Sequence, residues 1–195
     1  MISNRVLQAS LKGQILKDRN VVREFDRIAQ EQFQKIKKKM LSAFESHQVT
    51  KDLESFGGSD LVPRGTLFGF LGFEKGQNPI EPLRDILNRG TTLRPGRIRM
   101  QQGERVYVAT VPTKDELYAA TPLPWAPGRS WLKGVEFGIS GLGNYMVVTS
   151  SSSRSGEGIQ VENANLGGRF RNVKYISSIL KNMEKELLSI GVTIR

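Results

Sequence analysis

The sequence predicts an α+β fold in which a long N-terminal helix and a C-terminal helix pack on a mostly antiparallel sheet. Residues 18–46 repeat apolar side chains at helical spacing, and residues 172–189 do the same near the other end of the chain. Between them, residues 94–111 alternate apolar and polar side chains, as the two strands of a β-hairpin do. These three observations place helices at both ends of the chain and strands in its middle.

The segment from Asp18 to Ser46 carries the clearest helical pattern. Its apolar residues recur in steps of about three and four, which places them on one face of a helix whose opposite face is charged and basic. They are Val22, Phe25, Ile28, Ala29, Phe33, Ile36, Met40, Leu41 and Phe44. A helix of this length is on the order of 40 Å long, so we expect it to carry the apolar stripe on which the rest packs.

The predicted organisation is an N-terminal arm, residues 1–17, followed by a single α+β domain, residues 18–195, with a flexible loop near residues 56–66. Asp18 is a suitable cap for the start of the long helix. The loop is rich in glycine and proline, which interrupt regular structure. A turn or short helical piece at residues 47–54 comes before this loop, and we expect His47 to be a satisfied structural residue there.

Short elements follow the loop. Residues 66–73 (TLFGFLGF) form either a buried strand or an apolar plug that docks on a neighbouring subunit. Residues 79–88 predict a short helix. The hairpin strands at 94–100 and 105–111 turn at residues 101–104, and Thr113 with Glu116 has the spacing of a capping box.

The second half of the chain is less regular. Residues 121–128 (TPLPWAPG) predict a linker punctuated by proline, and residues 129–145 fit a helix or a strand equally well. Strands are expected at residues 146–149 and 159–161. Gly191 is expected to end the last helix, and residues 192–195 to add an edge strand.

The charge balance is strongly basic, with 29 Lys and Arg against 19 Asp and Glu, a net charge of +10 and a pI near 10. Such a charge favours nucleic acid, an acidic membrane or an acidic protein surface as partner, and carries no information about fold. Lysines cluster at residues 35–39 and arginines at residues 89–105. Each cluster is either a solvated face or a surface that contacts phosphate.

Several kinds of chemistry lack the residues they need. The chain has no cysteine and one histidine, which argues against disulfides, thiolate catalysis and a zinc site. It has no apolar run of membrane-spanning length and no signal-peptide pattern, so we expect a protein of the cytoplasm. Asp115 and Glu116 are explained as the first turn of a helix. We therefore predict no enzyme activity, no catalytic residue, no cofactor and no metal.

Four stretches, taken in order, resemble one family. They are AFESHQVTKDLE (43–54), GTLFGFLGFEKGQNPIEPL (65–83), PWAPGRSWLKGVEFGISGLGNY (124–145), and the pair RSGEGIQ (154–160) and GGRFRNVKYISSIL (167–180). With the basic N-terminal helix that ends in the first of them, they cover about half of the chain. The sequence is similar here to proteins of the head–tail neck of tailed bacteriophages, in the tail-completion and tail-terminator group.

This resemblance implies a structural virion protein that is assembled in the host cytoplasm. Its subunits close into a ring, sixfold in this group, which terminates or completes the tail and joins it to the connector. The implied partners are further copies of the chain and the neighbouring neck, connector and tail-tube proteins, with DNA passing through and no membrane.

A ring subunit needs apolar and charged complementary edges rather than a pocket. Our candidates for the subunit interface are Leu7, Leu11, Phe68, Phe70, Trp125 and Trp131. The candidates that face an acidic partner or DNA are Arg94, Arg97, Arg99, Arg105, Arg169 and Arg171.

The alternative function is a basic nucleic-acid-binding module, which the charge alone suggests. No helix-turn-helix, aromatic RNA-binding signature or zinc spacing supports it, and aromatic residues do not interleave the basic clusters.

Overall fold

The computed structural model describes residues 4–55, 66–99, 104–137 and 174–194. They group into two compact units. Unit 1 comprises Met1–Phe44, Asp85–Pro112 and Ser178–Arg195, and unit 2 comprises Glu45–Arg84 and Thr113–Ser177. The predicted division into an arm and a single domain, residues 1–17 and 18–195, stays a prediction.

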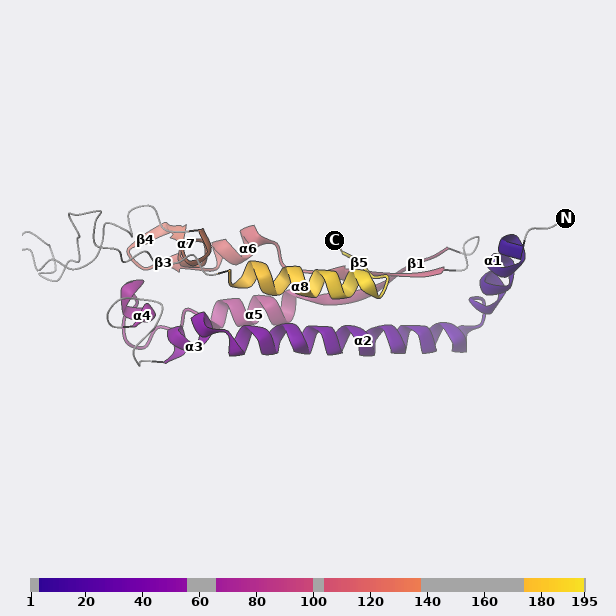
Figure 1. The fold of residues 1–195 in the computed structure, drawn as a ribbon, viewed down its shortest axis with the longest axis horizontal. Helices are drawn as coiled ribbons and strands as arrows, with labels where there is room; N and C mark the ends of the chain where they lie inside the picture. The colour runs from indigo at the N-terminus through magenta and orange to yellow at the C-terminus, as the bar shows by residue number, and fades with distance from the viewer. Residues whose placement is uncertain (1–3, 56–65, 100–103, 138–173, 195) are drawn as a thin grey trace, which may run out of the picture. The chain divides into compact units, whose positions relative to one another are not determined.

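The structure confirms a mixed helix and sheet fold with a long N-terminal helix, a C-terminal helix and a small sheet rich in antiparallel pairing (Figure 1). The helices are α1 (Asn4–Ile15), α2 (Arg19–Ser46), α3 (Gln48–Glu54), α4 (Leu67–Phe70), α5 (Glu81–Gly90), α6 (Lys114–Ala119), α7 (Trp131–Phe137) and α8 (Ile176–Ser189). The strands are β1 (Thr92–Arg99), β2 (Glu104–Thr110), β3 (Pro122–Leu123), β4 (Ala126–Ser130) and β5 (Thr193–Ile194).

Helix α2 begins one residue after its predicted cap. The Asp18 carboxylate accepts a hydrogen bond from the Asn20 N–H at 2.8 Å, which satisfies one of the free N–H groups of the first turn. The apolar stripe is buried only in the second half of the helix, at Phe33, Ile36, Met40 and Phe44. The predicted helix is confirmed, but its stripe is not buried along its whole length.

The sheet of unit 1 has the strand order β1-β2-β5. Strands β1 and β2 pair antiparallel from Thr92 opposite Thr110 to Arg99 opposite Glu104, with an irregularity between Pro95 and Ile98. This confirms the predicted hairpin, whose turn lies outside the described residues. Strand β5 is the expected edge strand and runs parallel to β2.

Helix α8 buries the face that the sequence predicted for it. The buried residues are Tyr175, Ile176, Ile179, Leu180, Met183 and Leu187. The helix ends in a Schellman motif, because Gly191 has a φ of 79°, its N–H bonds to the Leu188 carbonyl at 3.1 Å, and the Val192 N–H bonds to the Leu187 carbonyl at 3.1 Å. Buried Val192 and Leu187 supply the apolar side chains that accompany this motif.

Unit 2 holds the shorter elements. The capping box at Thr113 and Glu116 is confirmed at the start of α6. Residues 66–73 do not form a strand, because the Thr66 hydroxyl accepts a hydrogen bond from the Gly69 N–H and starts the short helix α4. The predicted docking of this segment on a neighbouring subunit stays a prediction.

The segment predicted as a linker, residues 121–128, instead pairs β3 with β4 in a small antiparallel hairpin. The Trp131 N–H donates to the Thr121 carbonyl at 2.8 Å and closes this hairpin onto the start of α7. The ambiguous segment 129–145 is therefore the end of a strand followed by a helix as far as Phe137.

Other predictions fall on residues that the structure does not describe. These are the flexible loop as far as residue 65, the strands at 146–149 and 159–161, and the candidates Arg169 and Arg171.

Candidate interaction surfaces

Two pairs of large apolar side chains stand exposed near the N-terminus of unit 1. Leu11 and Ile15 are four residues apart on α1, and Phe25 and Ile28 are three residues apart on α2, so each pair lies on one helix face. The four residues are between 43% and 53% exposed. We call them the arm pair and the α2 pair.

The α2 pair belongs to the same apolar stripe whose second half is buried. Phe33, five positions beyond Ile28 on the same helix, is fully covered within the unit. Nothing in the described part of the chain covers Phe25 and Ile28 in the same way. An apolar stripe that continues past the core it serves offers its remaining surface to another molecule.

The first half of α2 is nevertheless held firmly to the sheet. The Arg105 guanidinium donates two hydrogen bonds to the Asp26 carboxylate, from Nε at 3.1 Å and from Nη2 at 3.2 Å, and a third to the Gly96 carbonyl at 3.1 Å. The Tyr107 hydroxyl donates to the same carboxylate at 3.0 Å. Hydrogen bonding to Asp26 raises the pKa of Arg105, and burial together with Asp26 raises the pKa of Tyr107 to about 12.

The predicted arginine surface is thus divided. Arg105 is largely buried and its guanidinium is committed to Asp26, so it ties α2 to β2 instead of facing a partner. Arg94, Arg97 and Arg99 are exposed along β1, and Arg99 reaches Glu104 across the hairpin at 3.9 Å. The candidates Arg169 and Arg171 lie outside the described residues.

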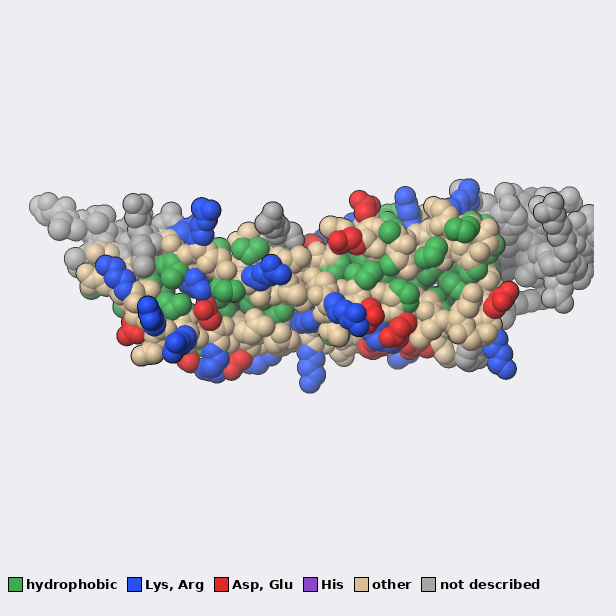
Figure 2. All heavy atoms as spheres, turned by 180° about the vertical axis from the view of Figure 1, so that it is seen from behind, with side chains coloured by type: hydrophobic (Ala, Val, Ile, Leu, Met, Phe, Trp, Pro, Cys, Tyr) green, Lys and Arg blue, Asp and Glu red, His purple; other side chains and the backbone are tan. Residues whose placement is uncertain are grey.

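The lysine cluster of α2 is also divided. The Lys37 ammonium donates to the carbonyls of Asn88 at 2.5 Å and Thr91 at 3.0 Å, where it satisfies carbonyls at the end of α5, and burial lowers its pKa. Lys39 pairs with Glu186 of α8. Lys35 and Lys38 are exposed. Figure 2 shows Lys and Arg side chains interspersed with Asp and Glu side chains on the surface that it draws.

The predicted interface aromatics of unit 2 are mostly interior. Phe68 and Trp131 are buried, and Phe73 lies between them with ring centroids 5.5 Å from Phe68 and 6.4 Å from Trp131. These two residues build the core of the unit instead of a surface that a neighbour could contact. Phe70 is half-buried.

Trp125 remains a candidate for the interface. Its side chain is 50% exposed, and its indole N–H donates to the Leu71 carbonyl at 3.1 Å. The ring lies so close to Gly72 that a Cβ there would come within 2.7 Å of it, and Gly72 has a φ of 81°. The indole is thereby fixed in place with half of its surface free. For Leu7 only the backbone is described, whereas Leu11 is exposed as an interface residue must be.

A buried carboxylate connects α7 with the start of α8 inside unit 2. Glu136 is 7% exposed, and it accepts hydrogen bonds from the Ser177 N–H at 2.7 Å and from the Tyr118 hydroxyl at 3.4 Å. The Ser177 N–H belongs to the first turn of α8 and has no acceptor within that helix. Glu136 thus caps the helix from a distance in sequence that local patterns do not reveal.

His47 has the structural role that the sequence suggested. Its Nδ1 accepts a hydrogen bond from the Val49 N–H at 3.2 Å, as the N-cap of α3, and its ring lies 4.6 Å from the ring of Tyr175. The Tyr175 hydroxyl bonds to Thr50 at 2.5 Å. Burial lowers the pKa of His47 and raises that of Tyr175.

The acidic residues nearby serve an ion-pair cluster. Arg84 pairs with Glu45 at 2.7 Å, Glu54 at 2.5 Å and Glu81 at 2.8 Å, and hydrogen bonding to these carboxylates raises its pKa. No group of three or more metal-ligating side chains occurs within the described ranges. Within the same ranges, no helix is long and apolar enough to cross a membrane.

Sequence reasoning missed Ile15, Phe25 and Ile28 as exposed residues. The helical spacing of Phe25 and Ile28 is the same as that of the buried residues that follow, so the sequence held no signal that separates the two halves of the stripe.

Comparison with family models, with curated proteins and with solved structures finds no match for this chain.

Proposed function

We propose that this chain is a structural virion protein whose subunits form a ring at the head–tail neck of a tailed bacteriophage. In this role it terminates or completes the tail and joins it to the connector. Its partners are further copies of itself and the neighbouring neck, connector and tail-tube proteins. The resemblance of the four stretches between residues 43 and 180 to neck proteins supports the place in the virion.

The exposed arm pair and α2 pair are the observation that carries the assembly part of this proposal. Full burial of a Leu, Ile or Phe side chain stabilises by about 1.5–3 kcal/mol, so covering the exposed half of each contributes roughly 1 kcal/mol. Four such side chains supply several kcal/mol to an interface. An isolated subunit that exposes them gives up this stabilisation.

The mass of the protein in solution tests the assembly. Light scattering over a range of protein and salt concentrations is expected to give a multimer for the natural chain, and negative-stain images are expected to show closed rings. Two double variants, Leu11→Asp with Ile15→Asp and Phe25→Asp with Ile28→Asp, are expected to shift the population to monomer. Leu188→Asp is the matched control, because Leu188 is an apolar residue, 60% exposed, outside both pairs.

Two results would contradict the proposed assembly. One is a natural chain that stays monomeric at every concentration and salt and also fails to join purified tails. The other is a multimer that both double variants preserve. The place in the virion has its own test, since particles made without this chain are expected to contain separate heads and tails.

The exposed arginines of β1 favour a second candidate, a nucleic-acid-binding module. Arg94, Arg97 and Arg99 lie within one strand and are exposed, as phosphate contacts must be. Under this alternative the monomer binds duplex DNA with a steep loss of affinity as salt rises, and Arg94→Glu with Arg97→Glu abolishes the binding. Rings that show no DNA binding at low salt would eliminate it.

A further inference from the structure

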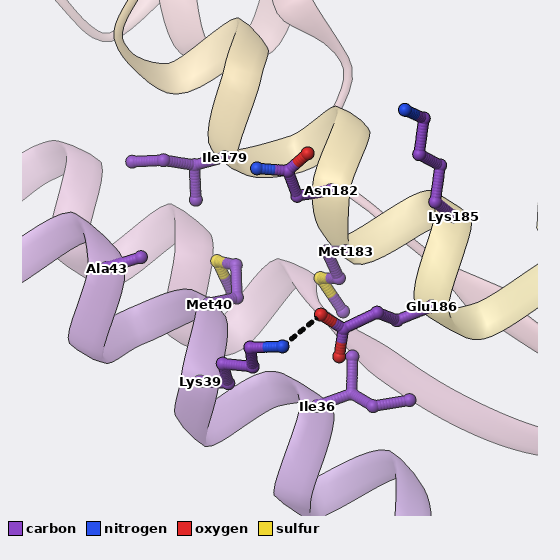
Figure 3. Close-up of a pocket in the computed structure, with 9 residues that line it drawn as sticks. All are labelled: Ile36, Lys39, Met40, Ala43, Ile179, Asn182, Met183, Lys185 and Glu186. Carbon is purple, nitrogen blue, oxygen red and sulfur yellow. Dashed lines mark hydrogen bonds and ion pairs between the residues drawn. The ribbon is translucent and has the colours of Figure 1, made fainter.

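A groove between α2 and α8 lies within unit 1, apart from the apolar pairs described above. It encloses a cavity of about 300 Å³. Its buried floor consists of Ile36 and Met40 from α2 and Ile179 and Met183 from α8. Figure 3 shows the side chains of Met40 and Met183 in the space between the two helices. Unbranched, polarizable methionine side chains adapt to an incoming group of irregular shape.

The rim of the groove is polar and carries more positive than negative charge. Lys39, Lys185, Asn182 and Glu186 line it together with Ala43. Lys39 pairs with Glu186 across the groove, whereas the Lys185 side chain extends away from it (Figure 3). Lys39 is 71% exposed, and an ion pair this exposed contributes little to stability, so it opens at small cost.

We propose that this groove binds an acidic amphipathic helix of a different protein. An apolar side chain of that helix enters the cavity between the methionines. Carboxylates beside it pair with Lys39, which leaves Glu186, and with Lys185, whose exposed side chain turns toward the groove. The volume suits one large apolar anchor and is at the lower limit for a small-molecule site. Two neighbouring helices with an apolar floor between them are the surface that a helix in a groove uses.

The charge distribution decides between this partner and a second copy of the chain. A second copy could offer the exposed apolar pairs of α1 and α2. The α1 sequence NRVLQASLKGQI contains basic residues and no acidic one, and α2 has seven Lys and Arg against four Asp and Glu. Placing either helix against Lys39 and Lys185 brings a net positive charge to a rim that is already positive. An acidic partner is attracted both by this rim and by the net charge of +10 of the chain.

Peptide binding tests the proposal directly. The probe is a fluorescein-labelled helical peptide with Leu at every third or fourth position and Glu at most of the others, and its binding is followed by anisotropy. The control peptides are the same sequence with Lys in place of Glu, and a scrambled one of equal composition without an apolar face. Only the acidic amphipathic peptide is expected to bind, and it is expected to shift the NMR signals of the Met40 and Met183 methyl groups.

Variants of the groove locate the binding. Ala43 is exposed at the groove, so Ala43→Trp blocks it without removing a core residue and is expected to weaken binding by at least about tenfold. Lys185→Glu is expected to weaken it by about fivefold. Lys38→Glu makes the same charge change on α2 outside the groove lining and is the matched control.

Three results would overturn the proposal. The first is equal binding of the acidic and basic peptides. The second is an Ala43→Trp variant that is folded, as an unchanged thermal midpoint shows, and binds the acidic peptide as tightly as the natural chain. The third is loss of self-assembly in Ala43→Trp, which would assign the groove to a second copy of the chain. The assembly tests of the two apolar pairs use other residues, so failure of the groove and failure of the ring are distinguishable.

Discussion

The carboxylate of Glu136 offers the sharpest test of how unit 2 is held together. It is buried, it accepts the Ser177 N–H at 2.7 Å, and the Tyr118 hydroxyl lies at 3.4 Å. A negative charge at the first turn of a helix is favourable, because the free N–H groups there carry partial positive charge. Replacing Glu136 by Leu removes both the hydrogen-bond acceptor and the charge, whereas replacing it by Gln removes only the charge.

The expected magnitude follows from these contacts. A hydrogen bond to a charged group contributes about 1.5–3 kcal/mol, and an N–H that loses its acceptor in a buried place costs about as much. The contact with Tyr118 is long and adds little. Glu136→Leu is therefore expected to lower the free energy of unfolding by about 2 kcal/mol. Glu136→Gln keeps an acceptor of similar size and is expected to cost less than about 1 kcal/mol.

Urea denaturation followed by circular dichroism measures both variants, and hydrogen exchange at the Ser177 amide reports the bond itself. The Leu variant is expected to show faster exchange at this amide, and the Gln variant to retain most of its protection. A Leu variant within about 0.5 kcal/mol of the natural chain would refute the capping role, because so small a loss is typical of a surface substitution. A Gln variant as unstable as the Leu variant would show that charge, and not an acceptor, is required.

Two further predictions concern other polar contacts. Asp26→Ala is expected to lower the free energy of unfolding by about 1–2 kcal/mol in urea denaturation, because it leaves the largely buried Arg105 without its main partner. The control Glu31→Ala, at an exposed ion pair, is expected to lower it by less than about 0.5 kcal/mol. Equal losses in the two variants would contradict this prediction. Because burial lowers the pKa of His47, the unfolded chain takes up a proton first, so stability is expected to be fully present well above pH 6.5 and to fall as the pH drops below it. His47→Asn, which keeps an acceptor for Val49, is expected to remove this dependence in a chain with one histidine, and an unchanged pH profile would refute it.

Local patterns predicted the elements whose signals lie within a few turns of chain. The long helix, the hairpin and the Schellman end of α8 follow from helical spacing, alternation and a glycine at the required position. The hairpin at β3 and β4 was missed because strands this short show no alternation among their prolines. Glu136 was missed because its partner Ser177 is distant in sequence.

The candidate surfaces were harder to predict, because exposure depends on what covers a residue. Arg105 reads in the sequence as one more arginine of a basic strand, yet Asp26 holds it from 79 positions away. Trp131 and Trp125 are near neighbours in a proline-rich segment, and only packing makes one a core residue and the other exposed. Residue type identified the candidates but did not show which of them are buried and which are exposed.

The contacts of Asp26 also bear on why the α2 pair suits an interface. Phe25 and Asp26 are adjacent on the helix, so their side chains point about 100° apart, one outward and the other toward Arg105 and Tyr107. The bonds of Asp26 therefore hold Phe25 in an ordered helix while it stays exposed. A surface ordered before binding loses less conformational entropy when a neighbour covers it. Asp26→Ala is therefore expected to weaken assembly as well as stability, although it removes no apolar contact. If that variant assembles as strongly as the natural chain, the bonds of Asp26 do not contribute to the interface.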